Sequence, residues 1–371
     1  MYLLNLENNS YFYPVVFLRI ILFPFSLLYG LAVWLRNKLF DWNILPSKSF
    51  DIPVISVGNL STGGTGKSPH VEYLVNLLKK DFIVATLSRG YKRKSKGFIL
   101  ADEKSDAKQM GDEPFQFKTK FPEVEVAVDE KRKRGIEKLL KLKPETDVVI
   151  LDDAFQHRYV KPGISILLTD FHQLYCSDYV LPTGNLREFR SGSKRADIII
   201  VTKTSKVLSP ITRRRIDEQL KPAPNQKLFF SYIRHQNPVP LPGIKKAADP
   251  DKDARFNTIL LVAGIANTYP LEMYLKNMCD ELEVMKFPDH HSYVQKDIIR
   301  IIERFENIIT RNKILVTTEK DSVRLRDPEL MKTLKNFPVY YIPIEIVIHR
   351  EDRREFNEII LNNVRKNKRD D

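Results

Sequence analysis

After residue 50, the chain alternates short apolar runs, rich in β-branched residues, with longer segments whose apolar positions recur at helical spacing. The apolar runs of the first half lie at residues 52–57, 82–87, 124–128, 147–151, 164–169 and 197–202. A helix is expected after the first run, from about Ser68 to Lys80. Strands separated by helices predict an α/β fold with a doubly wound parallel sheet.

The pattern changes between residues 220 and 253, where proline, lysine and aspartate are frequent, as in a connector or hinge. Apolar runs resume at residues 258–263, 283–287, 314–318 and 339–342, with helices beginning near Pro270 and Val294. We therefore expect a larger α/β domain at residues 46–233, a linker at 234–255 and a second, smaller α/β domain at 256–371.

The first 45 residues contain a long apolar stretch. Residues 15–35 carry one charge, Arg19, and as a helix would extend about 32 Å, close to the thickness of a bilayer core. Arg19, Pro24 and Gly30 interrupt the stretch, and aromatic and basic residues flank it, as at a membrane interface. We expect residues 1–45 to be a membrane-associating segment, with residues 15–35 as a helix that lies on or dips into a membrane. A true span and a buried helix covering the next domain remain open alternatives.

Charge and cysteine content narrow the class of protein. The 371 residues include 60 Lys and Arg against 47 Asp and Glu, a net charge of +13, which favours nucleic acid, an anionic membrane or a small phosphorylated substrate as partner. Basic runs at residues 92–96, 131–134 and 213–215 lack interleaved aromatic residues, so no nucleic-acid partner is expected. Two cysteines, Cys176 and Cys279, exclude a disulfide framework and suit a reducing cytosol.

Residues 58–68 read GNLSTGGTGKS, between a predicted strand and a predicted helix, which is the setting of a phosphate-binding loop (P-loop). Lys67 is expected to reach the β- and γ-phosphates of a nucleotide, and Ser68 to bind Mg²⁺. Ser61 departs from the common P-loop pattern, which has glycine there, but the two following glycines can supply the turn. The residues expected to surround phosphate with their backbone N–H groups are Gly63, Gly64, Thr65 and Gly66.

A P-loop requires an acidic partner on a neighbouring strand. The apolar run before residue 152 ends in Asp152 and Asp153, the arrangement that holds Mg²⁺ beside a P-loop. His157, close behind, is ambiguous between a structural and a functional role. A GTPase is not expected, because the one N-K-x-D match, at residues 367–370, lies in the charged tail.

Three further motifs carry candidate chemistry. GDEP at residues 111–114 places Asp112 and Glu113 in a tight turn, and LPTGNLRE at 181–188 pairs an arginine with Glu188. FPDHHSY at 287–293 could be a zinc site, but no third ligand has suitable spacing. A histidine held near a carboxylate, tuning a general base, is the better interpretation.

Together these motifs resemble the tetraacyldisaccharide 4′-kinases, the lipid A 4′-kinase family of Gram-negative bacteria. The matching segments run in order along nearly the whole chain: GNLSTGGTGKSP (58–69), LSRGYKRKSKG (87–97), GDEP (111–114), ILDDAFQHR (150–158), LPTGNLRE (181–188), AGI (263–265), FPDHHSY (287–293) and TTEKDSVRL (317–325). Ser68 replaces a more usual threonine and keeps the hydroxyl, and Ala154 stands where the family usually has glycine.

The resemblance implies a P-loop domain joined to a smaller α/β domain by a two-stranded linker. It also implies transfer of the γ-phosphate of ATP, with Mg²⁺, to the 4′-hydroxyl of a tetraacylated glucosamine disaccharide 1-phosphate, yielding lipid IVA. By similarity Asp112 would be the general base, with His290, or as second choice His291, as its partner. The residues implied to hold Mg²⁺ and phosphate are Glu113, Asp152, Asp153, Glu188 and, for phosphate, Arg132.

The expected location is the cytoplasmic face of the bacterial inner membrane, and the expected partners are the acylated disaccharide and the lipid surface, with no obligate protein partner. Two alternatives remain. The first is a membrane-associated P-loop ATPase that acts as a switch for a protein partner. The second is a nucleic-acid-dependent NTPase, which would bind DNA or RNA with a steep dependence on salt.

Overall fold

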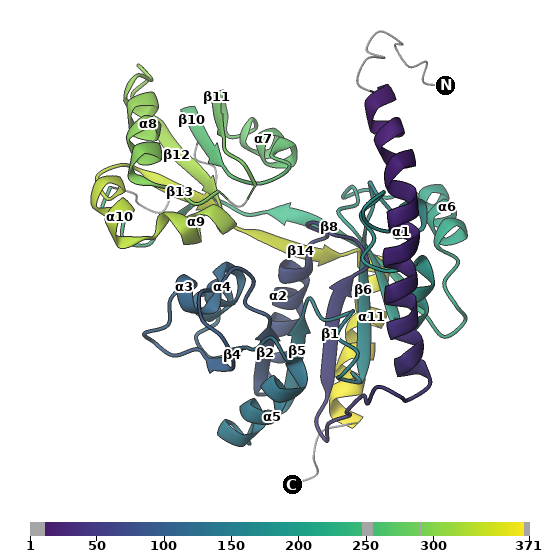
Figure 1. The fold of residues 1–371 in the computed structure, drawn as a ribbon. Coiled ribbons are helices and arrows are strands. Elements are labelled where there is room, and N and C mark those ends of the chain that lie inside the picture. Colours follow the sequence, from purple (N-terminus) through teal and green to yellow (C-terminus); the bar gives the residue numbers. More distant parts are fainter. Residues whose placement is uncertain (1–11, 247–254, 290, 367–371) are drawn as a thin grey trace.

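The computed structural model describes residues 12–246, 255–289 and 291–366, which form two α/β units and one long N-terminal helix (Figure 1). The larger unit is built on a nine-stranded sheet with strand order β14-β8-β7-β6-β1-β5-β2-β4-β3. Its strands are β1 (Val54–Asn59), β2 (Val84–Ser88), β3 (Ile99–Leu100), β4 (Glu125–Val128), β5 (Val148–Asp152), β6 (Ile164–Asp170), β7 (Ile198–Thr202), β8 (Lys227–His235) and β14 (Ile344–Ile348).

The helices of the larger unit cover both faces of this sheet, as a doubly wound fold requires. Ile55 and Val57 of β1 pack in one core with residues of α2, α4 and α11, whereas Val54 packs in a second core with α5 on the opposite face. The helices and short 3-10 helices are α2 (Lys67–Leu78), α3 (Ala107–Met110), α4 (Asp112–Lys120), α5 (Arg132–Leu142), η1 (Tyr175–Ser177), η2 (Arg190–Arg195), α6 (Pro210–Leu220) and α11 (Arg350–Lys366). The expected α/β class and parallel sheet are confirmed.

Strand β1 is the point where the chain changes direction across the sheet. It pairs in parallel with β5 on one side and with β6 on the other. Ligands of open α/β sheets bind beyond the carboxyl ends of strands at such a switch point. The register places Val57 opposite Asp152, so the loop after β1 and the acids after β5 leave the sheet side by side.

The smaller unit has a five-stranded sheet with strand order β11-β10-β12-β13-β9. Apolar cores lie on both of its faces, one with α8 and α10 and the other with α7. Its elements are β9 (Val239–Pro240), β10 (Phe256–Ala263), α7 (Tyr269–Leu275), β11 (Cys279–Lys286), α8 (Gln295–Glu306), β12 (Lys313–Thr318), α9 (Glu319–Leu325), α10 (Pro328–Leu334) and β13 (Val339–Ile342).

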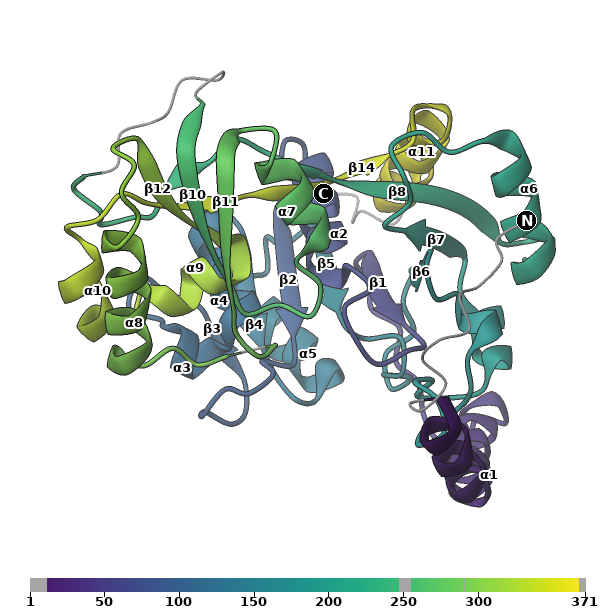
Figure 2. The ribbon, with the colours of Figure 1, turned by 90° about the horizontal axis from the view of Figure 1, so that it is seen from above.

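Two antiparallel strands connect the units, as Figures 1 and 2 show. β8 leads out of the larger sheet and β14 leads back into it, with Ile346 opposite Ile233. α11 then packs Phe356, Ile360 and Val364 into the core of the larger unit. The expected boundary of the smaller domain at 256–371 is therefore wrong at its C-terminal end, because β14 and α11 bury their apolar side chains in the larger unit. Residues 247–254 of the expected linker lie outside the described residues.

The N-terminal helix α1 (Phe12–Asp41) runs along the larger unit and is longer than the expected 15–35 (Figure 1). One face packs against the protein at Ser26, Gly30 and Phe40, which are buried. The opposite side exposes large apolar residues, among them Leu28, which is 67% exposed. Within the described part of the chain, no helix combines the length and apolarity needed to cross a bilayer. Because these side chains are exposed, α1 is not the buried helix that was one of the alternatives from the sequence.

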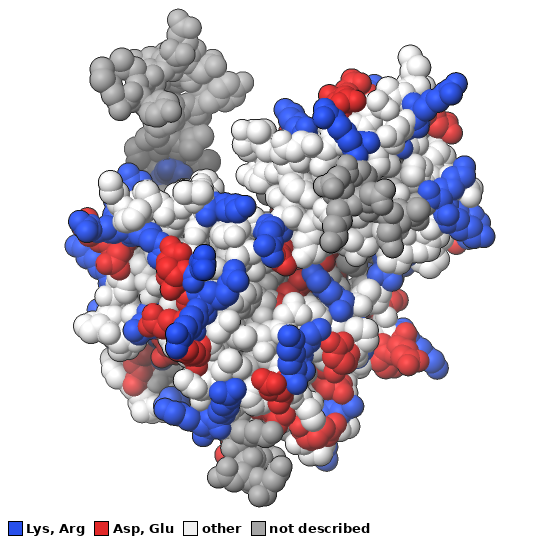
Figure 3. All heavy atoms as spheres, turned by 180° about the vertical axis from the view of Figure 1, so that it is seen from behind, with Lys and Arg blue, Asp and Glu red and all other residues white. Residues whose placement is uncertain are grey.

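Charged residues on the face seen from behind the view of Figure 1 are mixed in sign. Figure 3 shows lysine and arginine side chains interspersed with aspartate and glutamate over this face. Nucleic-acid-binding proteins present a basic stripe or patch. This face of the molecule has no such stripe among its described residues.

Candidate active site

The P-loop lies between β1 and α2, as the sequence predicts. Gly63 and Gly66 have positive φ angles of 110° and 86°, which glycine adopts without steric cost. A Cβ added to Gly63 or Gly64 would meet no described atom within 4 Å, so these residues face open space. Thr65 at the end of the loop and Ser68 in the first turn of α2 are both buried. The loop therefore leaves a backbone-lined space of the kind that receives phosphate groups.

Lys67 is held by two acceptors at the base of this loop. Its Nζ lies 3.3 Å from Oδ1 of Asn59 and 3.6 Å from Oδ1 of Asp153. The side chain of Asn59 also donates to Oγ1 of Thr65 at 2.9 Å, which fixes the amide. Lys67 is thus oriented toward the acidic end of β5.

The two acids after β5 have opposite electrostatic environments. Burial and the neighbouring carboxylates of Glu113 and Asp153 raise the pKa of Asp152 to about 7. Burial alone would raise the pKa of Asp153, but Lys67 and Arg187 outweigh it and lower that pKa. Asp152 is 2% exposed and its Oδ1 has no hydrogen-bond partner among the described residues. An unpartnered buried carboxylate oxygen beside a P-loop fits a magnesium ligand.

Arg132, expected to contact phosphate, is buried at the start of α5. Its guanidinium donates to the backbone oxygens of Asp129 at 2.9 Å and Asp152 at 3.2 Å, and its Nε has no partner among the described residues. Burial lowers the pKa of Arg132 to about 10, opposed by the charges of Asp152 and Asp153. Arg132 therefore fixes the end of β5, and its phosphate contact stays a prediction.

The loop at 181–188 packs against the P-loop. The backbone N–H of Thr62 donates to the oxygen of Asn185 at 2.7 Å, and that of Arg187 donates to the oxygen of Leu60 at 2.7 Å. The side chain of Arg187 donates to both carboxylate oxygens of Asp153, at 3.0 and 3.2 Å.

Glu188 occupies a different environment from the one expected of a metal ligand. It is 1% exposed, and both carboxylate oxygens accept hydrogen bonds from Arg195, at 2.8 and 2.9 Å. Oε2 also accepts from Asn37 at 2.7 Å, and Oε1 from Gln156 at 3.1 Å. Its metal-binding role stays a prediction, whereas these contacts give it a positioning role.

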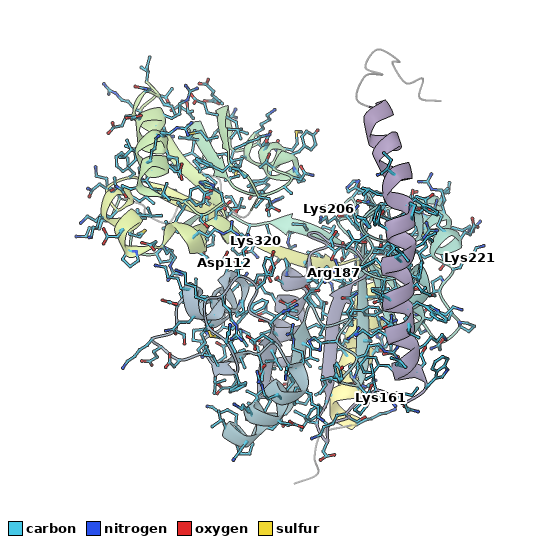
Figure 4. All side chains as sticks on the ribbon, viewed as in Figure 1. Asp112, Lys161, Arg187, Lys206, Lys221 and Lys320 are labelled. Atoms are coloured by element: carbon cyan, nitrogen blue, oxygen red, sulfur yellow. The ribbon has the colours of Figure 1, made fainter. Side chains whose placement is uncertain are left out.

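Asp112 and Glu113 begin α4 and face α9 of the smaller unit. Gly111 before them has a φ of 91°, and a Cβ there would lie 3.0 Å from the backbone oxygen of Tyr91, which explains a glycine at this turn. Arg324 Nε donates to Oδ2 of Asp112 at 3.0 Å, and Lys320 Nζ lies 3.7 Å from Oε1 of Glu113. Figure 4 places Asp112 and Lys320 at this junction, and Arg187 beside α1.

The histidine pair of FPDHHSY is only partly described, since His290 lies outside the described residues. His291 stacks on Phe287 with ring centroids 4.8 Å apart, and its Nε2 lies 2.8 Å from Oδ2 of Asp297. His157, left ambiguous by the sequence, contacts the backbone oxygen of Glu130 through Nε2 at 3.1 Å, and burial lowers its pKa to about 4. The Nδ1 of His157 is buried without a partner among the described residues, so the choice between a structural and a functional role stays open.

Sequence reasoning overlooked several residues of this site. Lys320 and Arg324 lie one helical turn apart in the TTEKDSVRL motif, and that spacing in a motif already singled out was a usable signal. Gln156 lies in the ILDDAFQHR motif, which was already singled out, whereas Asn37 gave no such signal. In the described part of the chain, no three His, Cys, Asp or Glu side chains cluster as a metal site.

This site has a glycine-rich loop between β1 and α2, a lysine at the start of α2, and acids at the end of the adjacent strand. These features define a P-loop nucleotide-binding protein. A sequence profile described as "Tetraacyldisaccharide-1-P 4'-kinase" matches residues 18–365. The chain belongs to this family.

Individual relatives agree with this assignment over most of the chain. The tetraacyldisaccharide 4'-kinase of Bacteroides thetaiotaomicron is 50% identical over 357 residues, covering 94% of each chain. That of Flavobacterium johnsoniae is 49% identical over 352 residues, covering 94% of this chain and 98% of the relative. The crystal structure of LpxK from Aquifex aeolicus in complex with ATP matches with a TM-score of 0.71 and 30% identity, covering 94% of this chain and 99% of that one.

Proposed function

We propose that this protein is a kinase that transfers the γ-phosphate of ATP to the 4′-hydroxyl of a tetraacylated glucosamine disaccharide 1-phosphate. The observation that carries the proposal is the P-loop lysine, which lies 3.6 Å from Asp153 at the end of the adjacent strand, in a chain of this kinase family. The product is the 4′-phosphorylated lipid A precursor, lipid IVA.

The residues present fit ATP and Mg²⁺. The open space at Gly63 and Gly64 would receive the phosphates, with Lys67 against the β- and γ-phosphates. Ser68 and the unpartnered oxygen of Asp152 would hold Mg²⁺, which neutralises charge on the transferred phosphoryl group. The other proposed ligands are Asp153, Glu113 and Glu188.

We assign the general base to Asp112, with His290 as its partner. The carboxylate would accept the proton of the 4′-hydroxyl as that oxygen forms its bond to the γ-phosphorus and the bond from phosphorus to the ADP oxygen breaks. Support comes from its position at the junction of the two units, where a motion of the units would bring groups together around the acceptor. An Asp112→Ala enzyme that keeps its activity would eliminate this role.

We place the enzyme on the cytoplasmic face of the bacterial inner membrane, attached through α1. The support is the row of exposed apolar residues on α1, which the larger unit leaves uncovered: Ile21, Phe25, Leu28, Leu31 and Leu35. An amphipathic contact of this kind buries apolar side chains in the boundary between headgroups and acyl chains. The acylated acceptor resides in the same layer.

The direct test uses ATP labelled at the γ-phosphate, Mg²⁺ and the lipid disaccharide in detergent. The proposal expects the wild-type enzyme to label the glycolipid and the Lys67→Ala enzyme to leave it unlabelled. If label is recovered only in free phosphate, and a protein partner stimulates its release, the ATPase switch is favoured instead.

A further inference from the structure

Helix α1 touches the C-terminal end of the 181–188 loop at two neighbouring residues, Arg187 and Glu188. The hydroxyl of Tyr29 donates to the backbone oxygen of Arg187 at 3.0 Å, and Nδ2 of Asn37 donates to Oε2 of Glu188 at 2.7 Å. The helix can approach closely because residue 30 is glycine, where a Cβ would lie 2.5 Å from the ring of Phe189. These contacts are more specific than membrane attachment alone requires.

From Glu188, hydrogen bonds continue to the P-loop. Nε2 of Gln156 donates to Glu188 at 3.1 Å and to the backbone oxygen of Asn59 at 2.9 Å. The side-chain oxygen of Asn59 is an acceptor for Lys67 at 3.3 Å. An unbroken series of contacts therefore joins Asn37 on α1 to the lysine of the P-loop.

A second route starts at Arg187. Its backbone is bound by Tyr29, and its guanidinium holds Asp153, the other acceptor of Lys67. Asp153 is thus held by a residue that α1 contacts directly. The backbone of Asn59 is held by Gln156, whose own backbone oxygen accepts from Arg36 of α1 at 3.4 Å. A lysine ammonium on a flexible stem depends on such acceptors for its position.

We propose that α1 is a positioning element of the phosphate site, which sets the turnover rate through Arg187 and Glu188 in addition to attaching the protein to lipid. This inference rests on the proposed kinase function. Glu188 is the centre of the arrangement because its carboxylate is buried and needs every donor around it. Displacement of α1 removes the Asn37 donor, frees the 187–188 segment and loosens Lys67. Lipid that binds α1 and keeps it docked on the 181–188 loop therefore also orders the phosphate site.

The test compares variants on one face of α1. Asn37→Asp replaces a donor with a carboxylate facing Glu188, and we expect kcat to fall about tenfold or more, as for other lost supports of a reactive group. Asn37→Ala should lower kcat by less than Asn37→Asp, because it removes the donor without adding a charge. The KM for the lipid acceptor and binding to vesicles should stay within about twofold of wild type, because the apolar face of α1 is unchanged.

Ser26→Ala is the matched control. Ser26 also docks α1 on this loop, through its hydroxyl contacts with Thr183 at 2.6 and 2.9 Å, but Thr183 is not part of either route to Lys67. We expect Ser26→Ala to keep kcat within about twofold.

Two outcomes would overturn the inference: an Asn37→Asp enzyme with wild-type kcat, or a Ser26→Ala enzyme that loses as much activity as Asn37→Asp. Should Asn37→Asp fail to fold, Tyr29→Phe tests the second route, with an expected loss in kcat of about threefold for one hydrogen bond. Phosphate release from ATP without acceptor gives the same ranking of variants. If the variants hydrolyse ATP in this ranking but the wild-type enzyme never labels lipid, the proposed acceptor is overturned. The positioning of the phosphate site by α1 is then still supported.

Discussion

Arg324 of the smaller unit donates a hydrogen bond to Asp112 of the larger unit at 3.0 Å. The arginine is itself fixed, because its Nη1 donates to Asp321 at 2.9 Å, and Asp321 accepts from the backbone N–H of Gly264 at 2.8 Å. The carboxylate proposed as general base is therefore held by a cation anchored in the other unit. The site depends on both units for its geometry.

Arg324→Gln removes this cation and should lower kcat by about tenfold or more, because Asp112 loses the partner that orients it. Steady-state kinetics with ATP and the lipid acceptor measures the change. Lys332→Gln breaks a solvent-exposed ion pair with Glu329 in the same unit and serves as control, with no expected effect. Equal activity of Arg324→Gln and wild type would show that the contact has no part in positioning Asp112.

Asp152→Asn should separate stability from activity. Because burial and nearby carboxylates raise the pKa of Asp152 to about 7, the folded protein retains this proton at higher pH than the unfolded chain does. Its stabilising contribution is present below about pH 4 and is lost as pH rises through about 7. The neutral variant should therefore melt about 3 °C above wild type at pH 8 without Mg²⁺, and only about 1 °C above it at pH 5.

Thermal melts of wild type and Asp152→Asn at the two pH values, together with kinase assays, test this. The variant should be inactive, since an amide replaces a proposed magnesium ligand. A melting difference that does not change with pH would contradict the assigned environment of Asp152.

Gly58 and Gly64 should respond differently to alanine. In Gly58→Ala the new Cβ would lie 2.7 Å from Cβ of Phe155, and overpacking of this kind costs about 1–3 kcal/mol of stability. In Gly64→Ala the Cβ meets open space, so the melting temperature should hold while kcat/KM for ATP falls about tenfold or more, because the methyl group occupies the phosphate space. Gly64→Ala with unchanged ATP kinetics would argue against phosphate at this position.

Leu28→Ser with Leu31→Ser should weaken binding to vesicles of anionic phospholipid by about tenfold or more, as two exposed leucines lose their place in the lipid. Sedimentation with vesicles measures the bound fraction. Ile309→Ser removes an apolar side chain that is 97% exposed on the smaller unit, and it should leave binding unchanged. Equal losses for both surfaces would mean that α1 is not the lipid contact.

The parts of this structure that sequence reasoning anticipated are governed by local rules. A glycine loop after a strand, acids at the end of an apolar run and alternating strands and helices each depend on neighbours in the chain, and the α/β class and parallel sheet follow from them. The P-loop was found at the expected junction of β1 and α2.

The parts that it did not anticipate depend on contacts between distant segments. The family resemblance implies a two-stranded linker, but the proline-rich stretch that contains β8 does not indicate its partner. That partner, β14, lies more than a hundred residues later, in a segment assigned by sequence to the smaller domain. Arg324 and Asp112 are likewise far apart in sequence, and the contact of Asn37 with Glu188 requires the docked helix. Pairing partners of this kind are tertiary information.

The most direct measurement is the mass of the lipid after incubation of the tetraacylated disaccharide 1-phosphate with enzyme, ATP and Mg²⁺, followed by fragmentation between the two sugars. The account predicts a gain of one phosphate, carried by the sugar distal to the 1-phosphate, and no gain with Lys67→Ala. A lipid of unchanged mass while ATP is consumed, or a second phosphate on the sugar that already carries the 1-phosphate, would contradict it.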